Sequence, residues 1–464
     1  MNSAAQNRAP EQKPGLVRGL SLLDSVLLIV GGVIGSGIFL TAKNIAQAVP
    51  TPSLFLLVWV VGGAITLLAA FAFAELGAMY PEAGGHYVYL REAYGEPVAF
   101  LYGWMITLVG ATGGFAALAV AGAQYLGVLF PILSAKHRVA TFAGHAITRP
   151  DLVAIAAVAI VTWVNVRGVR RGAVLQNVAT WAKIGAIAAF VVLGAALGKG
   201  NWAHLDAVLP ATAGHTSLIG FGVALIAVFW AYDGWVYLSW IGGEVRDAQR
   251  TLPRALVLGV ALVGAIYLVT NLVYLYALPV SEIATSAQTT AATAAATLFS
   301  PRAANWLAAL IAVSCFGALA AGIMSGARVY YAMAVDKVFF RKMAELHPRW
   351  RTPAFALVVQ GVWTAILTVS GRYDQLYTYT LFMMVLSYVA GVAGLFVLRR
   401  TRPEVPRPYR CTGYPVVPAL YILLGLAWAV NTVIAQPRET LAGIAIVALG
   451  VPVYVYWRWR QVRH

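Results

Sequence analysis

The sequence predicts an all-α membrane protein with twelve transmembrane helices, in which helices 1 and 6 are broken and two groups of five helices form an inverted repeat. Three observations lead to this fold class. They are an apolar composition, about twelve apolar stretches near 20 residues in length, and two places where glycines interrupt such a stretch. The paired interruptions distinguish this fold from a plain bundle of membrane helices.

The composition places the chain in a membrane. Of its 464 residues, 60% are hydrophobic and 11% are charged, and the mean hydropathy is +0.76. A soluble protein could not expose such a composition to water. The net charge of +16 raises nucleic acid as a partner, but the basic residues lie in short loops and form no separate basic domain. We therefore expect the lipid bilayer as a partner and no nucleic acid.

Apolar stretches long enough to cross a bilayer recur along the whole chain. They lie approximately at residues 22–47, 54–80, 96–128, 151–166, 174–197, 217–241, 255–279, 302–335, 353–370, 374–398, 414–436 and 440–458. With both termini in the cytoplasm, about 23 of the 33 Lys and Arg residues lie on the inner side and about 8 on the outer. This asymmetry predicts cytoplasmic termini. The polar start of the chain has no cleavage site, so we expect the first span to be retained.

The first span contains the stretch GGVIGSGIFL, residues 31–40, where four glycines occupy seven positions. Apart from proline, glycine is the residue that most weakens a helix. Small residues also permit close packing of membrane helices, which is the alternative explanation for this run. A second interruption elsewhere in the chain would favour a break in the helix over close packing.

That second interruption lies in the sixth span, in FWAYDGWVYLSW, residues 229–240, where Asp233 and Gly234 follow an apolar run. It comes five spans after the first, and an odd number of spans inverts the second half relative to the first. Matching broken helices indicate an inverted-repeat transporter with a binding site where the breaks meet. We expect an N-terminal tail, two repeats, two additional helices and a C-terminal tail, at residues 1–21, 22–197, 217–398, 414–458 and 459–464.

Broken helices offer a ligand both kinds of main-chain polar group. The half-helix that begins at a break has unpaired N–H groups, and the half-helix that ends there has free carbonyls. A zwitterion fits both. We expect its carboxylate on N–H groups around Gly35, Ser36 and Gly37, with the Ser36 hydroxyl as a further donor. We expect its ammonium group to face carbonyls near four residues, Val33, Ile34, Trp230 and Ala231.

Several long motifs resemble those of the amino acid-polyamine-organocation (APC) superfamily, and within it the L-type amino acid transporters and their bacterial relatives. GGVIGSGIF resembles the motif of the first helix, and FAELGAMYPEAGGHYVYLREAYGEPVAFLYGW, residues 73–104, resembles helices 2 and 3. FWAYDGW with GGEVRDAQRTLPRA resembles helix 6 and the following loop, and RPEVPRPYRCTGYP, residues 402–415, resembles the loop before helix 11. The resemblance implies the LeuT-type fold and the transport of a small neutral L-amino acid.

The resemblance also implies roles for individual residues in the two broken helices. It carries over substrate contacts at Val33, Ser36 and Gly37 in the first, and at Trp230, Ala231 and Asp233 in the sixth. Trp230 stands where the family keeps an aromatic gate that closes over the substrate, and a packing tryptophan is the alternative. Val236 occupies a position where many relatives have Asn, so recognition through a polar side chain is not expected there.

Two charged residues inside the spans invite a coupling role. Lys183 lies well inside the fifth span, where a charged side chain is costly unless another group pairs with it or it has a function. The resemblance implies that its ammonium group takes the place of a sodium ion and ties the first helix to the eighth. It could also carry a proton, so exchange and proton coupling both stay open. Asp233 is either the N-cap of the half-helix near Gly234 or a proton carrier.

Three further charged residues are expected to have structural roles. We expect Asp24 and Glu75 to act as gate or loop-anchoring residues at the cytoplasmic ends of their spans, and a transport role for them stays open. Arg328 is expected to pair with another group, or to reach the interface, near the inner end of the eighth helix.

Other functions are disfavoured by what the sequence lacks. The seven histidines are scattered over loops without metal-ligand spacing, and there is no P-loop, so we expect no enzyme, no cofactor and no metal. A receptor that binds an amino acid without moving it is the alternative function. Residues 129–150, the outer loop that in mammalian relatives holds a disulfide-linked heavy subunit, contain no cysteine. We therefore expect a monomer in a bacterial-type inner membrane.

Overall fold

The computed structural model describes residues 15–142, 145–206, 218–286, 289–371 and 373–462. Parts of the expected tails, residues 1–14 and 463–464, and the first residue of the sixth expected span, 217, lie outside the described residues. Within the described part, ten segments are long and apolar enough to cross a membrane, and residues 219–232 and 354–370 form shorter apolar helices. Each predicted span overlaps one of these segments. An all-α membrane protein is therefore confirmed, while the number twelve stays a prediction.

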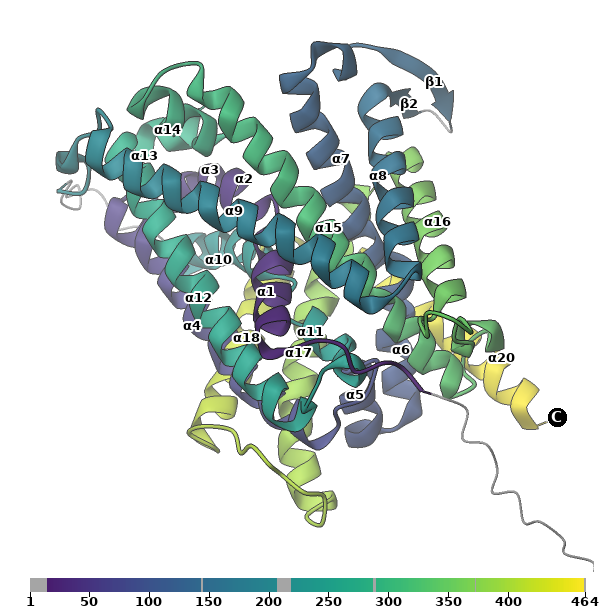
Figure 1. Ribbon diagram of the computed structural model, residues 1–464. Helices are drawn as coiled ribbons and strands as arrows, with labels where there is room; N and C mark the ends of the chain where they lie inside the picture. Colours follow the sequence, from purple (N-terminus) through teal and green to yellow (C-terminus); the bar gives the residue numbers. More distant parts are fainter. Residues whose placement is uncertain (1–14, 143–144, 207–217, 287–288, 372, 463–464) are drawn as a thin grey trace, which may run out of the picture.

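The helices of the apolar segments run in chain order and account for most of the described residues (Figure 1). They are α1 (Leu22–Val33), α2 (Gly37–Leu40), α3 (Ala42–Ala48), α4 (Pro52–Met79), α6 (Glu96–Met105), α7 (Ala111–Leu129), α8 (Arg149–Val166), α9 (Val169–Leu197), α10 (Leu218–Tyr232), α11 (Tyr237–Trp240), α12 (Ala248–Ala277), α15 (Ala303–Val335), α16 (Ala354–Ser370), α17 (Tyr373–Thr401), α18 (Val416–Ala435), α19 (Pro437–Ala448) and α20 (Gly450–Val462). A π-helical turn, η1 (Ile106–Gly110), joins α6 to α7.

Short elements fill the loops at the two ends of the bundle. The sequence does not predict them, because they are neither long nor uniformly apolar. They are α5 (His86–Tyr94), α13 (Val280–Thr285), α14 (Thr290–Leu298), the single turns η2 (Pro131–Leu133), η3 (Trp202–His204), η5 (Gly242–Glu244) and η6 (Arg341–Ala344), and the antiparallel hairpin of β1 (Arg138–Phe142) and β2 (His145–Thr148). In Figure 1 the hairpin, α13 and α14 lie at one end, and α5 lies at the other.

Local signals in the sequence explain where several membrane helices start. Ser21 and Asp24 form a capping box at the start of α1, and Thr148 and Asp151 form one at the start of α8. Thr51 caps α4, whose first residue is a proline. These caps satisfy N–H groups that have no partner inside the helix.

α1 lies in the middle of the bundle, packed against α9, α12 and α15 (Figure 1). The face of α9 toward α1 is polar, with Gln176, Thr180 and Lys183 following one another at helical spacing. The Gln176 amide donates to the carbonyl of Leu27 in α1 (2.6 Å). This buried polar stripe fixes α9 beside the end of α1.

Candidate functional site

The first membrane helix is interrupted between α1 and α2. α1 ends at Val33, residues 34–36 leave the helix, and α2 begins at Gly37. The N–H group of Gly35 turns back to the carbonyl of Val33 (2.8 Å). A Cβ atom on Gly37 would lie 2.6 Å from Cα of Ala231, so glycine at this position permits direct contact with the other broken helix.

The second interruption separates α10 from α11 at residues 233–236. Gly234 has a φ of +106°, which side-chain-bearing residues rarely adopt, and a Cβ atom there would lie 2.7 Å from the carbonyl oxygen of Gly32. The two breaks therefore meet main chain to main chain, at Gly32 with Gly234 and at Gly37 with Ala231.

Tyr267 of α12 joins the two breaks and was not predicted. Its hydroxyl lies 3.0 Å from the carbonyl oxygen of Val33 and 2.8 Å from that of Ala231. A hydroxyl has one proton, so it donates to one of these carbonyls at a time. The ring is fully buried, so this contact holds the end of α1 next to the end of α10.

A cavity of about 50 Å³ lies at this junction. Its lining combines both breaks with residues of η1 and α7, two residues of α11 and one of α17: Gly32, Val33, Gly35, Ser36, Gly37, Gly110, Ala111, Gly114, Ala117, Leu118, Trp230, Asp233, Tyr237, Trp240 and Met384. Most predicted substrate residues line it, whereas Ile34 and Ala231 do not. The space corresponds to a few water molecules, so it suits a small ligand.

The first break presents hydrogen-bond donors to this cavity. In the described part of the chain, the N–H groups of Ser36 and Gly37 have no acceptor, and the Ser36 hydroxyl makes no hydrogen bond. Unpaired main-chain donors in a membrane span are costly unless a ligand or water satisfies them. This end of the cavity is suited to an anionic group.

The carbonyls that we expected to face an ammonium group already have donors in the protein. The carbonyl of Ile34 accepts from Lys183 Nζ (2.6 Å) and Ser314 Oγ (2.8 Å), which fills both of its lone pairs. The carbonyl of Trp230 accepts from the N–H group of Asp233 (3.3 Å). The carbonyl of Val33 also accepts from the N–H group of Gly35, and Tyr267 has one proton for Val33 and Ala231, so the carbonyl of Ala231 keeps a lone pair for a ligand in either case. Ile34 faces Lys183, outside the cavity.

Lys183 reaches from α9 into the gap between the end of α1 and α15. Its ammonium group donates to the carbonyls of Gly31 (2.9 Å), Ile34 (2.6 Å) and Ser314 (3.0 Å), and the side chain is fully buried. Carbonyl oxygens arranged around one positive charge are also the ligands that coordinate small hard cations in proteins. The lysine thereby ties the broken first helix to α15.

Trp230 lines the cavity and also a cleft of about 470 Å³ whose other walls include Leu40, Asn44 and Gln436. The tryptophan therefore forms part of the partition between the enclosed cavity and an open cleft. This position is compatible with a gate.

Asp233 lies between two cavities. It lines the junction cavity and a second one of about 30 Å³, and its carboxylate accepts from the Tyr388 hydroxyl (2.9 Å). α11 begins at Tyr237 with Val236 in the N-cap position, so of the two roles expected for Asp233 the N-cap is excluded and the proton carrier stays a prediction. The turn is three residues longer than an N-cap at Asp233 would require, and Gly234 within it adopts a positive φ.

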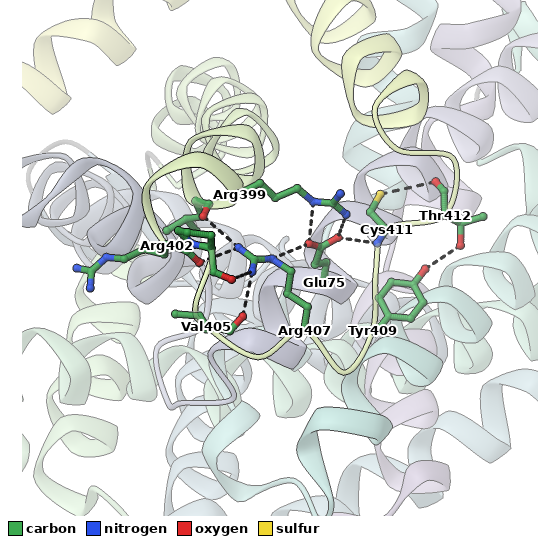
Figure 2. Close-up of polar contacts among 10 residues, drawn as sticks. Glu75, Arg399, Arg402, Val405, Arg407, Tyr409, Cys411 and Thr412 are labelled. Carbon is green, nitrogen blue, oxygen red and sulfur yellow. Dashed lines mark hydrogen bonds and ion pairs between the residues drawn. The ribbon is translucent and has the colours of Figure 1, made fainter.

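Ion pairs close the end of the bundle that carries α5. Figure 2 shows the carboxylate of Glu75 in α4 beside two arginines, Arg399 (2.6 Å) and Arg407 (3.5 Å), with the N–H group of Cys411 at 2.6 Å. Glu75 is fully buried. Burial and the Glu75 carboxylate raise the pKa of the Cys411 thiol to about 12. Glu75 thus anchors the loop at residues 402–415, a role that the sequence analysis had left beside gating.

A second ion pair at this end is completely buried. The guanidinium group of Arg328 in α15 binds both carboxylate oxygens of Glu244 at 2.8 Å. The carbonyl of Glu244 in turn accepts from the N–H groups of Gly19 and Leu20. The expectation that Arg328 pairs near the end of its helix is met. Its partner, Glu244, holds the segment before α1.

Several residues of the site were missed for a common reason. The helices that carry them are apolar on every side, so periodicity does not show which face points inward. These residues are Tyr267 of α12, Ser314 of α15, Gly110 of η1 and Gly114 of α7. The closely spaced glycines where η1 meets α7 are the one signal that could have indicated close approach to a ligand.

Comparison with known proteins identifies the family. The family profile described as amino acid permease matches residues 20–453, nearly the whole chain. The chain belongs to the amino acid permease family. It is 32% identical over 449 residues to the serine/threonine exchanger SteT of Bacillus subtilis, covering 96% of this chain and 98% of that protein. The resemblance to the APC superfamily is thereby confirmed, and this permease is a multi-pass membrane transporter rather than an enzyme.

Mammalian relatives lie at a similar distance from this permease. The b(0,+)-type amino acid transporter 1 of Mus musculus is 30% identical over 460 residues, covering 96% of this chain and 90% of that protein. The large neutral amino acids transporter small subunit 2 of Homo sapiens is 30% identical over 450 residues, covering 96% and 81%. These names support amino acid transport as the general activity of the permease.

Proposed function

We propose that the permease is a secondary transporter of small neutral L-amino acids that works by alternating access, without sodium, by exchange or proton coupling. The observation that carries the proposal is the junction of the two breaks. There, the cavity is lined by Val33, Ser36 and Gly37, and the N–H groups of Ser36 and Gly37 have no acceptor in the described part of the chain. The carbonyl of Ala231, which Tyr267 contacts, lies next to Gly37 at the same junction. The carboxylate of an amino acid fits the donors, and its ammonium group fits the acceptors.

The size of the cavity supports a small substrate. The wall formed by η1 and α7 consists of Gly110, Ala111, Gly114 and Ala117, and Trp230 covers one side. Among the described lining residues the only ionisable acid or base besides Tyr237 is Asp233, whose carboxylate is bound by Tyr388. A neutral side chain suits these surroundings better than a charged one.

Lys183 supports sodium independence. Its ammonium group occupies the carbonyl cage between α1 and α15, so a cation is already fixed where a transported ion would otherwise be needed. The printed name of the Bacillus relative contains the word exchanger, which favours exchange over proton coupling as the first hypothesis.

The same proposal covers topology and partners. The broken helices lie five spans apart, as the LeuT-type inverted repeat requires, and the Lys and Arg distribution favours cytoplasmic termini in an inner membrane. Both cysteines, Cys315 and Cys411, are buried. A disulfide-linked heavy subunit is therefore not expected, and we propose a monomer. The alternative is a membrane receptor that binds an amino acid without moving it.

A counterflow experiment tests the proposal. The permease is reconstituted in sodium-free proteoliposomes loaded with each of the twenty amino acids in turn, and uptake of labelled L-serine is measured at two pH values. Small neutral amino acids inside should stimulate uptake. Stimulation without pH dependence indicates exchange, and strong pH dependence indicates proton coupling. Saturable binding without any accumulation would support the receptor instead.

A further inference from the structure

A groove outside the transport pathway runs along the seam between α8 and α16. Its volume is about 430 Å³, and its walls are apolar apart from one hydroxyl. The lining residues are Ile155, Val158, Ala159, Thr162, Trp163, Val166, Val358, Gly361, Val362 and Ala365. Trp163 and Val362 are each 55% exposed, so the groove lies on the outer surface of the bundle, which faces lipid.

The length of the groove matches one leaflet of a bilayer. Eleven residues separate Ile155 from Val166, which corresponds to about 17 Å along a helix. The hydrocarbon core of a bilayer is about 30 Å thick, so the groove spans roughly half of it and ends where α8 ends. This is the side of the membrane to which we assigned most of the Lys and Arg residues.

A positive charge stands at that end of the groove. The guanidinium group of Arg167 lies over the ring of Trp163, with 3.6 Å between its central carbon and the ring centre. In the part of the chain that the structure describes, no carboxylate pairs with Arg167. Arg170 and Arg171 follow in the first turn of α9. An apolar groove with a basic mouth is complementary to an anionic lipid.

One buried polar atom lies inside the groove without a partner. The hydroxyl of Thr162 makes no hydrogen bond to any described residue, and the side chain is 8% exposed. It lies against Gly361 of α16, where a Cβ atom would be 2.5 Å away. Five residues separate Thr162 from Arg167, so the backbone at Thr162 lies about 7.5 Å farther along α8, toward the middle of the membrane, than the backbone at Arg167. The oxygen packs against Gly361, and a change of the χ1 rotamer turns it to the groove, where a ligand can supply the missing acceptor.

We propose that the groove is a binding site for an anionic glycerophospholipid. The phosphate group lies at Arg167, an ester carbonyl accepts from the Thr162 hydroxyl, and one acyl chain follows Val158 and Ile155 along the seam. Glycerophospholipids place their ester carbonyls below the phosphate and their chains below the esters, in the order of these three features. The site does not depend on the transported substrate.

Native mass spectrometry of the delipidated full chain in detergent tests the site. The permease is titrated with phosphatidylglycerol and with phosphatidylcholine of identical acyl chains. We expect one tightly held lipid and a preference for phosphatidylglycerol of about fivefold in affinity. This is the usual contribution of one arginine to the binding of an anionic membrane surface. Arg167→Gln should abolish the preference. The matched control is Arg250→Gln, at an exposed position of α12, and it should retain the preference.

Two further variants separate the groove from a general charge effect. Ala365→Trp should fill the groove from α16, and Ala159→Phe should fill it from α8, so each should release the retained molecule of both lipids. Thr162→Val should weaken both lipids equally. The proposal is overturned if Arg167→Gln keeps the preference, or if both filled variants, still monodisperse, hold one lipid with unchanged affinity.

Discussion

Ser36 is the side chain whose removal most directly probes recognition of the substrate carboxylate. Its hydroxyl faces the cavity without a partner in the described part of the chain. Because a hydrogen bond to a charged group contributes about 1.5–3 kcal/mol, Ser36→Ala should raise the KM for uptake about tenfold or more. Uptake kinetics in proteoliposomes measure this. Ser53→Ala, an exposed serine at the start of α4, is the control, and an equal KM for both variants would contradict the assignment.

Lys183 carries a separate prediction about the packing of α1. Lys183→Met keeps the length of the side chain but removes the donor that the carbonyls of Gly31, Ile34 and Ser314 share, of which Ile34 retains Ser314 Oγ. The penalty for each buried unsatisfied group is about 1–3 kcal/mol, so we expect a lower thermal unfolding midpoint together with loss of uptake. The exposed Lys199→Met should change neither quantity. A Lys183→Met protein with normal uptake would refute the role of the ammonium group.

Which residues form the breaks could be predicted, but their contacts could not. The glycine run and the Asp233–Gly234 pair carried enough signal to locate the site, and Val33, Ser36, Gly37 and Trp230 do line it. Which donor each carbonyl binds depends on the position of a side chain that is distant in the sequence. The sequence does not show that Lys183 takes the Ile34 carbonyl, because those residues are 149 positions apart.

At the scale of the elements, Gly234 tests whether the breaks must meet. Gly234→Ala adds a Cβ atom against the carbonyl of Gly32 at a position with positive φ. We expect a destabilisation of about 1–3 kcal/mol and loss of uptake, measured by thermal unfolding and transport. Gly264→Ala in α12 is the matched control, since the nearest atom there is 3.7 Å away. Equal behaviour of the two variants would show that the close approach is unnecessary.

The anchoring of the loop at residues 402–415 can be followed through Cys411. In a Cys315→Ala background, Glu75→Gln removes the carboxylate that holds Arg399 and the Cys411 N–H group. Maleimide labelling of Cys411 should then accelerate at least about tenfold, because the thiol loses both its burial and the charge that disfavours the thiolate. The conservative change Asp151→Asn, at the start of α8 beside the hairpin, should leave the rate unchanged.

The same thiol predicts a pH dependence in the Cys315→Ala protein. Only the thiolate reacts, and the pKa of Cys411 is about 12 in the folded protein. The labelling rate should therefore rise steadily as the pH is increased from 7 to 10, without the plateau expected near the ordinary thiol pKa of about 8.5. A plateau by pH 9.5 would mean that the loop is open in solution.

For the whole molecule, the length and hydropathy of the apolar stretches predicted the membrane helices well. The helices at the ends of the bundle, such as α5 and α14, and the hairpin at residues 138–148 were missed. These elements are short, and their stability comes from packing against the membrane helices, which a local pattern does not contain. The buried pair of Arg328 and Glu244 was predicted only in part, for the same reason.

The central claim is that the two broken helices recognise the main-chain head group of an amino acid. Competition against uptake of labelled L-serine by three compounds with the same small side chain tests it most directly: L-alanine, L-alaninamide, which lacks the carboxylate, and L-lactate, which lacks the ammonium group. The account predicts that L-alanine competes and that both analogues are weaker by about a hundredfold, since each loses one charged hydrogen-bonding group. Competition by either analogue as strong as that of L-alanine would contradict it.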